Sequence, residues 1–331
     1  MKKIYYLLLL SSLTSLSQTQ IGSDINGEAA DDWSGWSVSS SSNGNIVAIS
    51  AKNNDGNGAN SGHVRVYQNM SGVWTQVGLD INGEAAGDNS GESVSLSADG
   101  SIIAIGASKN DGNGNSSGHV RVYKNVSGVW TQVGSDIDGE AMYDDCGDSV
   151  SLSSDGNILA IGASYNNGNG NGSGHVRVYQ NISGVWTKIG SDINGEAAGD
   201  RSGLSVSLSS NGTIVAIGSP YSNVNGDDSG QVRIFQNISG VWTKIGSNIN
   251  GEDGIVFGHN VSLSSDGNTV AVSAPFSDEN GNNTGHVRVY QNISGVWTQI
   301  GTNIIGEAAA DRSGYSISLS SAGSIVAIGA Y

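Results

Sequence analysis

The 331-residue sequence has little proline, cysteine or charge: it contains 2 Pro and 1 Cys, and 13% of its residues are charged. A single Cys cannot form a disulfide within the chain, so a disulfide-stapled scaffold is excluded. No stretch shows the 3.6-residue apolar period of a helix, which argues against a helical bundle. Basic residues are also scarce, and the net charge of -16 would repel phosphate backbones, so we expect no nucleic-acid partner.

Long apolar runs are almost missing as well. The one clear run, residues 4–10, follows Lys2 and Lys3 and precedes the small-x-small pattern Ser15-Leu16-Ser17. Such a segment is too short to span a bilayer comfortably and is typical of a secretory signal peptide of bacterial type, which we place at residues 1–17. We therefore expect a bacterial protein that does not span the membrane and is secreted, extracellular or held at the cell surface.

What the chain has in abundance is glycine, 50 residues, arranged in a repeat. Regularly alternating apolar clusters argue against disorder. The segment SGxSVSLSxxG recurs at spacings of 56, 56, 56, 55 and 56 residues. Its anchors are Gly35, Gly91, Gly147, Gly203, Gly258 and Gly314.

One copy contains four strand-like segments, at 93–97, 102–107, 119–123 and 129–134. Four short antiparallel strands form a propeller blade, which must stack on its neighbours to bury both faces. The sequence therefore predicts an all-β fold over residues 18–331. It is a β-propeller of four-stranded antiparallel blades, with five complete ~56-residue repeats plus a partial sixth. A β-solenoid or a string of small sandwiches are the alternatives.

The two ends of the chain carry further expectations. Residues 19–25 match a fourth strand and precede the first copy, which predicts an N-terminal strand that completes the last blade. The sequence stops inside the sixth copy, so we expect it to be C-terminally truncated and part of a longer chain. Cys146 occupies a position that is Ser90 and Ser202 in its neighbours, and we interpret it as a drifted serine, not a nucleophile.

These motifs resemble the FG-GAP repeat, in the variant common in secreted bacterial proteins. Phe257-Gly258 stands at the FG position, and Gly218-Ser219-Pro220 and Ser273-Ala274-Pro275 stand at the GAP position. The resemblance implies the integrin-like β-propeller found at the head of integrin α chains, and a role in cell adhesion or ligand binding. The family's calcium loop between the first two strands is here only a turn, such as Ala98-Asp99-Gly100, so that site is not carried over.

A longer loop between the second and third strands is rich in Asn, Asp and Gly. Its carboxylates are weak candidates for calcium, the one cofactor that the sequence suggests, since the loop lacks the alternating carboxylates and bidentate Glu of an EF-hand. A turn chosen for positive φ is the alternative. The candidates are Asp55, Asp111, Asp227, Asp228 and Asp278.

The link between copies is acidic. In an up-and-down blade the link and the long loop emerge at the same end, so one face of the ring should collect the acidic side chains. We predict that this face binds the ligand, with turn capping and solubility as the alternative. The candidates are Glu28, Asp32, Glu84, Asp88, Glu140, Asp144, Glu196, Asp200, Glu252, Glu307 and Asp311.

Other recurrent residues suggest packing instead of chemistry. One Trp recurs in every fourth strand (Trp74, Trp130, Trp186, Trp242, Trp297) and indicates a packing layer, with an aromatic binding ladder as the alternative. Trp33 and Trp36 are not repeated and are better candidates for a specific role. The histidines that open the third strands (His63, His119, His175, His286) lie in separate blades and should not converge on one metal.

No nucleophile–base pair, phosphate loop or metal-ligand motif is present in the sequence. We therefore expect a non-enzymatic, secreted or cell-surface propeller that binds an extracellular protein or glycan. A structural repeat module of a larger surface protein and a polysaccharide-active propeller enzyme are the alternatives.

Overall fold

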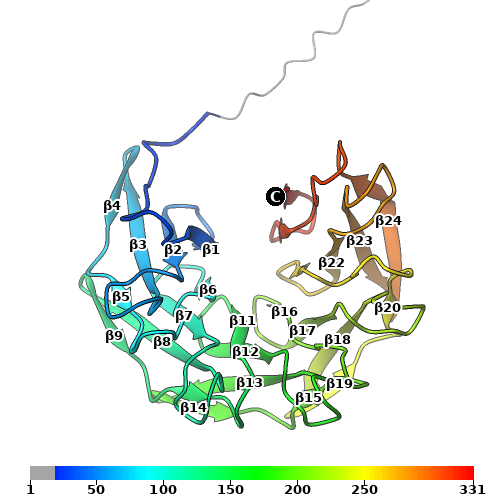
Figure 1. Ribbon diagram of the computed structural model, residues 1–331, viewed down its shortest axis with the longest axis horizontal. Helices are drawn as coiled ribbons and strands as arrows, with labels where there is room; N and C mark the ends of the chain where they lie inside the picture. The colour runs from blue at the N-terminus through cyan, green and yellow to red at the C-terminus, as the bar shows by residue number, and fades with distance from the viewer. Residues whose placement is uncertain (1–18) are drawn as a thin grey trace, which may run out of the picture.

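A computed structural model describes residues 19–331, so the predicted signal peptide lies outside the described residues. The described chain consists of strands and turns, with six antiparallel sheets arranged around a common centre (Figure 1). This arrangement confirms the all-β propeller predicted from the repeat. None of the described residues forms an apolar helix of membrane-spanning length.

Each sheet is one copy of the repeat. Blade 1 comprises β1 (Ser34–Ser40), β2 (Ile46–Ala51), β3 (His63–Met70), β4 (Val73–Gln76) and β5 (Ile81–Asn82). Blade 2 comprises β6 (Ser93–Leu96), β7 (Ile102–Ala107), β8 (His119–Val126), β9 (Val129–Gln132) and β10 (Ile137–Asp138). Blade 3 comprises β11 (Cys146–Leu152), β12 (Ile158–Ala163), β13 (His175–Ile182), β14 (Val185–Lys188) and β15 (Ile193–Asn194).

The remaining strands follow the same plan. Blade 4 comprises β16 (Ser205–Leu208), β17 (Ile214–Ser219), β18 (Gln231–Ile238), β19 (Val241–Lys244) and β20 (Ile249–Asn250). Blade 5 comprises β21 (Val261–Leu263), β22 (Thr269–Ala274), β23 (His286–Ile293) and β24 (Val296–Ile305). The sixth sheet holds β25 (Ser316–Leu319) and β26 (Val326–Gly329).

The outer strand of a blade differs from the single strand that the sequence predicts. In blade 2 the strand expected at 129–134 is β9, and a further short strand, β10, follows in the segment expected to be a link; both pair with β8. Gly134 lies between the two with φ 77°, and its counterpart Gly301 has φ 71° inside the continuous outer strand of blade 5. Blade 5 keeps one long outer strand, β24, with a register shift instead of a break.

The N-terminal segment corrects a second prediction. Residues 19–25 form no strand, and the carbonyl of Ile21 instead accepts a hydrogen bond of 2.9 Å from Trp74 Nε1 of blade 1. The ring is open between blade 1 and the sheet of β25 and β26 (Figure 1). Because that sheet holds only two strands, it presents no third strand with which residues 19–25 could pair.

The core lies between neighbouring blades. Val120 and Val122 of blade 2 pack with Leu152, Leu159 and Ile161 of blade 3, all at most 8% exposed. The second strands are buried on both faces, which explains why they read as unbroken apolar runs. Removing such side chains from water contributes about 25 cal/mol per Å² of apolar area, so blades stabilise one another.

The recurrent Trp joins each blade to the one before it. Trp130 packs against the core between blades 1 and 2, and its Nε1 donates a 2.8 Å hydrogen bond to the carbonyl of Val77. Trp186 repeats the bond to Val133 one blade later, at 3.0 Å. The interpretation as a packing layer is confirmed for four of the five residues, while Trp74, in the first blade, bonds the N-terminal segment instead.

The alternating serines of the first strand join the innermost strands of neighbouring blades. First strands are edge strands, so half of their backbone N–H groups lack a partner within the blade. Ser95 Oγ accepts a 2.9 Å hydrogen bond from the amide of Leu152 in the next blade, and Ser151 Oγ accepts one of 3.0 Å from Leu208. The SVSLS pattern thus supplies apolar side chains to the core and hydroxyl acceptors to the neighbouring strand.

Candidate functional site

The long loops and the links lie at the same end of each blade, as the up-and-down topology predicts. In blade 1 the amide of Gly83 in the link donates to the carbonyl of Gly62 in the loop, at 2.8 Å. Asn57 Nδ2 of the same loop donates to the carbonyl of Gly83, also at 2.8 Å. The opposite face carries only the tight turns between strands. We call the first of these surfaces the long-loop face.

The acidic residues of the links divide into two groups. The Asp carboxylates are buried: Asp88 is 3% exposed and accepts hydrogen bonds from the amide of Ala85 at 2.9 Å and from Asn110 Nδ2 at 3.1 Å. Asp32, Asp144 and Asp200 make the same amide contact, and Asp311 makes it with the more exposed Ala308. These aspartates cap the link through their Oδ2 atoms, and the buried Oδ1 of Asp144 has no hydrogen-bond partner among the described residues.

The Glu residues of the links are largely exposed, and five of them face an arginine of the third strand. Glu84 Oε1 lies 3.3 Å from Arg121 Nη1, and Glu252 Oε1 accepts a 2.8 Å bond from Arg288 Nη2. Glu28, Glu140 and Glu196 make the corresponding pairs at 3.6–3.9 Å. Glu307 is exposed and follows the last complete blade.

The calcium candidates of the long loop also act as turn caps. Asp55 Oδ1 accepts a 2.8 Å hydrogen bond from the amide of Asn60, and Asp111 and Asp278 repeat this contact. Asn167 makes the same contact in blade 3, so the cap does not require a charge. Asp227 and Asp228 lie in the same loop of blade 4, where Asn223 is the cap. Calcium binding here stays a prediction.

A different group of side chains surrounds the centre of the long-loop face. Three positions of the repeat carry a different chemical type in almost every copy. The first position is Trp33, Asn89, Asp145, Arg201, Val256 and Arg312. The second is Trp36, Glu92, Asp148, Leu204, His259 and Tyr315. The third is Asn53, Lys109, Tyr165, Tyr221 and Phe276. We call these residues the inner rim.

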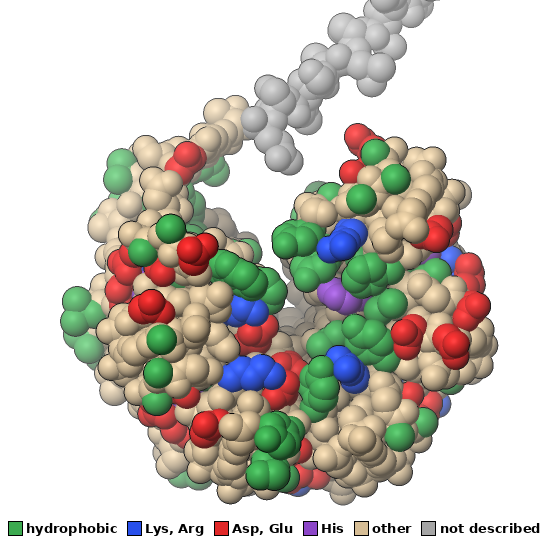
Figure 2. Space-filling model, viewed as in Figure 1, with side chains coloured by type: hydrophobic (Ala, Val, Ile, Leu, Met, Phe, Trp, Pro, Cys, Tyr) green, Lys and Arg blue, Asp and Glu red, His purple; other side chains and the backbone are tan. Residues whose placement is uncertain are grey.

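The inner rim follows from the topology. The first two positions flank the start of the innermost strand, and the third lies just beyond the end of the second strand. Figure 2 shows hydrophobic, basic and His side chains gathered around the central opening of this face. In a repeat protein, packing constrains residues that meet identical neighbours, so free variation among copies marks positions that the framework does not use.

In blades 1 and 2 the inner rim is aromatic and charged. Trp33 and Trp36 lie with ring centroids 5.3 Å apart and are 52% and 39% exposed. Lys52 Nζ lies 3.3 Å above the Trp36 ring and 3.0 Å from Glu92 Oε2. The Trp36 Nε1 donates to the same carboxylate at 3.1 Å. These contacts hold a flat, exposed aromatic surface beside an ion pair.

Between blades 2 and 3 the inner rim is acidic. Lys109 pairs with Asp145, and Ser164 Oγ donates to Asp148. Burial raises the pKa of Asp148 to about 7, and the nearby carboxylates of Asp145 and Glu92 add to the rise. Burial also raises the pKa of Asp145. A carboxyl group that titrates near neutrality can donate or accept a proton.

The other blades continue the aromatic character. The Arg201 guanidinium lies between the rings of Tyr165 and Tyr221, at 4.2 and 4.8 Å. The His259 ring lies 5.2 Å from the ring of Tyr315, and burial lowers the pKa of His259 to about 4. The structure places Trp33 and Trp36, which the sequence singled out for a specific role, in the inner rim. Comparing copies position by position would have found the rest.

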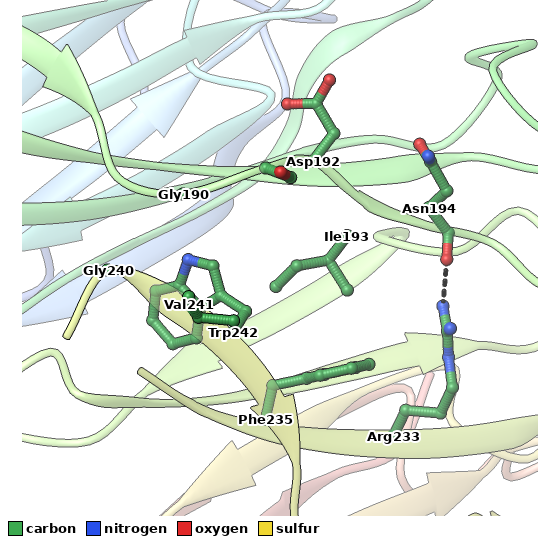
Figure 3. Close-up of a pocket in the computed structure, with 10 residues that line it drawn as sticks. Gly190, Asp192, Ile193, Asn194, Arg233, Phe235, Gly240, Val241 and Trp242 are labelled. Atoms are coloured by element: carbon green, nitrogen blue, oxygen red, sulfur yellow. Dashed lines mark hydrogen bonds between the residues drawn. The ribbon is translucent and has the colours of Figure 1, made fainter. Parts of the chain in front are cut away.

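Shallow crevices also lie between blades, on the outer side. One of about 330 Å³ is lined by Trp242, Val241, Phe235, Ile193 and the ends of their strands (Figure 3). Arg233 Nη2 donates to the carbonyl of Asn194 beside it, at 2.9 Å. A crevice of about 350 Å³ recurs one blade later at Trp297. Because framework residues line both, they are features of blade packing.

Comparison with known proteins supports the fold and family. Residues 79–123 match the model of the FG-GAP repeat. No characterised protein sequence matches the chain. The periplasmic gluconolactonase PpgL of Pseudomonas aeruginosa superposes with a TM-score of 0.55 at 16% identity, over 88% of this chain and 77% of that one. Hydrazine synthase of Kuenenia stuttgartiensis gives 0.54 at 11% identity, over 89% and 82%.

A third similar structure, from Bacteroides uniformis and described as a 6-phosphogluconolactonase, gives a TM-score of 0.52 at 12% identity, over 82% of this chain and 86% of that one. At these identities the likeness shows the fold alone. It nevertheless corrects the expectation that this protein is not an enzyme, because solved structures named as enzymes share its architecture. The expectation rested on the lack of catalytic motifs in the sequence, and such a lack is not evidence against catalysis.

The segment that matches the family spans the end of one copy and most of the next, and its residues recur in the other copies at the same register. The strands, the inter-blade Trp and the ring arrangement recur with them. The chain therefore has a β-propeller fold, and its repeat matches the FG-GAP repeat over residues 79–123.

Proposed function

We propose that this protein is a secreted or cell-surface propeller that binds an extracellular glycan at the inner rim of its long-loop face. The observation that carries the proposal is the pairing of exposed aromatic rings with charged groups at positions that the framework leaves free. Trp36, with Lys52 and Glu92 at its edge, is the strongest example.

A sugar ring suits such a surface. Its C–H face packs on a flat aromatic ring, and its hydroxyls form hydrogen bonds with charged side chains around that ring. The rim is open and surrounds the centre of the ring, so side chains from several blades lie close to one shared opening. Glycan binding of this kind would serve adhesion to a polysaccharide-coated surface.

The test is binding of the purified chain to a panel of immobilised polysaccharides. We expect the Trp36→Ala variant to lose roughly 10-fold in affinity, which corresponds to about 1.4 kcal/mol. Leu79→Ala is the matched control, since Leu79 is 88% exposed but lies outside the inner rim. Retention of no polysaccharide, or equal binding by both variants, would contradict the proposal.

A polysaccharide-active enzyme is the second candidate, and the observation that favours it is Asp148. Its carboxyl has a pKa of about 7 and lies at the inner rim near Asp145 and Glu92. Incubation with the polysaccharides retained on the panel would then release shorter products. Asp148→Asn should abolish product release and leave binding intact, whereas intact polysaccharide after incubation with the unmodified chain would argue for binding alone.

A further inference from the structure

In three blades the histidine that opens the third strand faces two carboxylates. The sets are Glu28, His63 and Asp80; Glu84, His119 and Asp136; and Glu140, His175 and Asp192. In each set one ligand atom from every residue lies within 4.8 Å of the other two. The three sets are copies of one arrangement, since their members recur at intervals of one repeat.

Blade 2 shows how the fold builds the arrangement. His119 is the first residue of β8, Asp136 lies in the interruption between β9 and β10, and Glu84 comes from the link before the blade. His119 Nδ1 lies 3.9 Å from Glu84 Oε2 and 3.8 Å from Asp136 Oδ2. Asp136 directly precedes β10, whose pairing of Asp138 with His119 holds this segment beside the histidine.

The imidazole has no hydrogen-bond partner among the described residues. His119 is 1% exposed, and its distances to both carboxylates exceed the 3.2 Å that a normal N–H···O bond allows. Nδ1 therefore presents either a lone pair to two negative groups or an N–H that reaches neither. A cation between the three atoms would remove this conflict.

The second oxygen of each carboxylate is held by another side chain. Glu84 Oε1 pairs with Arg121 Nη1 at 3.3 Å, and Asp136 Oδ1 accepts a 2.6 Å bond from Gln132 Nε2. The oxygens that remain, Oε2 and Oδ2, are the two that face His119. Such outer contacts orient the ligands of protein metal sites.

Blade 4 shows what the arrangement becomes when two of its residues change. Gln231 and Asn248 replace the His and the Asp, and Glu196 is kept. Asn248 Nδ2 donates to Gln231 Oε1 at 2.6 Å and to Glu196 Oε2 at 3.0 Å. In blade 4 the Asn248 amide N–H₂ therefore lies between the other two side chains and donates a hydrogen bond to each. In blade 2 the corresponding three side chains form no hydrogen bonds with one another.

We propose that each of blades 1, 2 and 3 binds one divalent transition-metal ion of the zinc type through its Glu, His and Asp. One imidazole nitrogen with two carboxylate oxygens is a donor set that zinc accepts, and a fourth position stays open to water. Ligand atoms on a tetrahedral zinc ion lie roughly 3.3–3.6 Å apart. In blade 2 the distances from His119 Nδ1 to the two carboxylate oxygens are 3.9 and 3.8 Å, and all three ligand atoms lie within 4.8 Å of one another, so the carboxylates need to close on the ion. The Glu side chains, 44–46% exposed, are free to do so.

The ion would also connect the link between two blades to the blade that follows it. Glu84 belongs to the link between blades 1 and 2, and His119 and Asp136 belong to blade 2, so the metal would tie the link to the blade that follows. Binding to the folded state alone raises its stability. We therefore expect zinc to raise the melting temperature of the chain.

The experiment is equilibrium dialysis of the full, chelator-stripped chain against micromolar zinc chloride, followed by elemental analysis. We expect three zinc ions per chain. The double variant His119→Gln with Asp136→Asn copies the blade 4 pair into blade 2 and should lower the count by one. Gln231→His with Asn248→Asp completes the set in blade 4 and should raise the count by one.

Each of these outcomes has a counterpart that would overturn the proposal. Absence of bound zinc from the unmodified chain would do so, as would the same zinc count in the chain and both double variants. Calcium binding without zinc binding would refute a site built around an imidazole. Melting curves of the metal-free proteins serve as the folding control, since blade 4 already accommodates the Gln and Asn pair.

Discussion

The hydroxyl of Ser95 accepts a 2.9 Å hydrogen bond from the amide of Leu152, 57 residues further along the chain. This bond joins the innermost strands of blades 2 and 3 and recurs between their neighbours. The bond explains why serine recurs in the first strand. Strand propensity does not explain it, since β-branched and aromatic residues are the ones enriched in strands.

Ser95→Ala should destabilise the protein by about 1–3 kcal/mol, because it leaves the amide of Leu152 without an acceptor at a partly buried position. Urea unfolding at neutral pH measures the effect. Ser135→Ala is the control, since Ser135 is exposed between β9 and β10 and should change the free energy of unfolding by less than about 0.5 kcal/mol. Equal effects of the two substitutions would contradict the role given to Ser95.

Gly139→Ala should be severely destabilising, by roughly 3 kcal/mol or more, because a Cβ there would lie 1.9 Å from the carbonyl oxygen of Ser117. Gly128→Ala tests backbone strain without a clash, since Gly128 has φ 87° and open space around it. We expect it to cost about 1 kcal/mol. The two melting temperatures should therefore differ clearly, and a smaller loss in Gly139→Ala would be inconsistent with the close approach of loop and link.

Asp88→Ala should destabilise the fold by about 1–3 kcal/mol, because it uncaps the amide of Ala85 and leaves Asn110 without its acceptor. Glu84→Gln should have little effect in the presence of a chelator, because the Glu84 side chain is 46% exposed and its pair with Arg121 is partly solvated. Chemical denaturation compares the two. The reverse order would show that the link aspartates are not structural.

Asp148→Asn should change the pH dependence of stability. Burial raises the pKa of the folded-state carboxyl to about 7 from an unfolded value of 3.8, so folding favours the protonated form. The raised pKa therefore adds to the free energy of unfolding below pH 4, where the carboxyl is protonated in both states. This contribution is lost as the pH rises toward 7 and the folded-state carboxyl ionises. The variant lacks that loss and should exceed the unmodified chain at pH 8 by roughly 1–3 kcal/mol, after allowance for partial solvation. At pH 4 the two should converge, and a constant difference across the range would refute the shifted pKa.

How far the sequence predicts this structure can be judged from particular residues. The second strand at Ile102–Ala107 lies where its apolar run placed it, because a strand buried on both faces carries that pattern locally. The short strand at Ile137–Asp138 lies in a segment expected to be a link, because two residues carry no strand pattern of their own and pair only where β8 offers an edge. Residues 19–25 carry a strand pattern and still form no strand, because strand formation requires a partner.

The sequence alone determined the repeat, its blade-sized period, the order of its strands and the acidic charge of the chain. These are properties of neighbours along the chain. Only the tertiary structure decided that Asp88 is buried while Glu84 is exposed, that Glu84 and Asp136 meet at His119, and that the variable positions form one inner rim. All three depend on contacts between residues from about 17 to more than 50 positions apart, which exist only after the blades have stacked around a common centre.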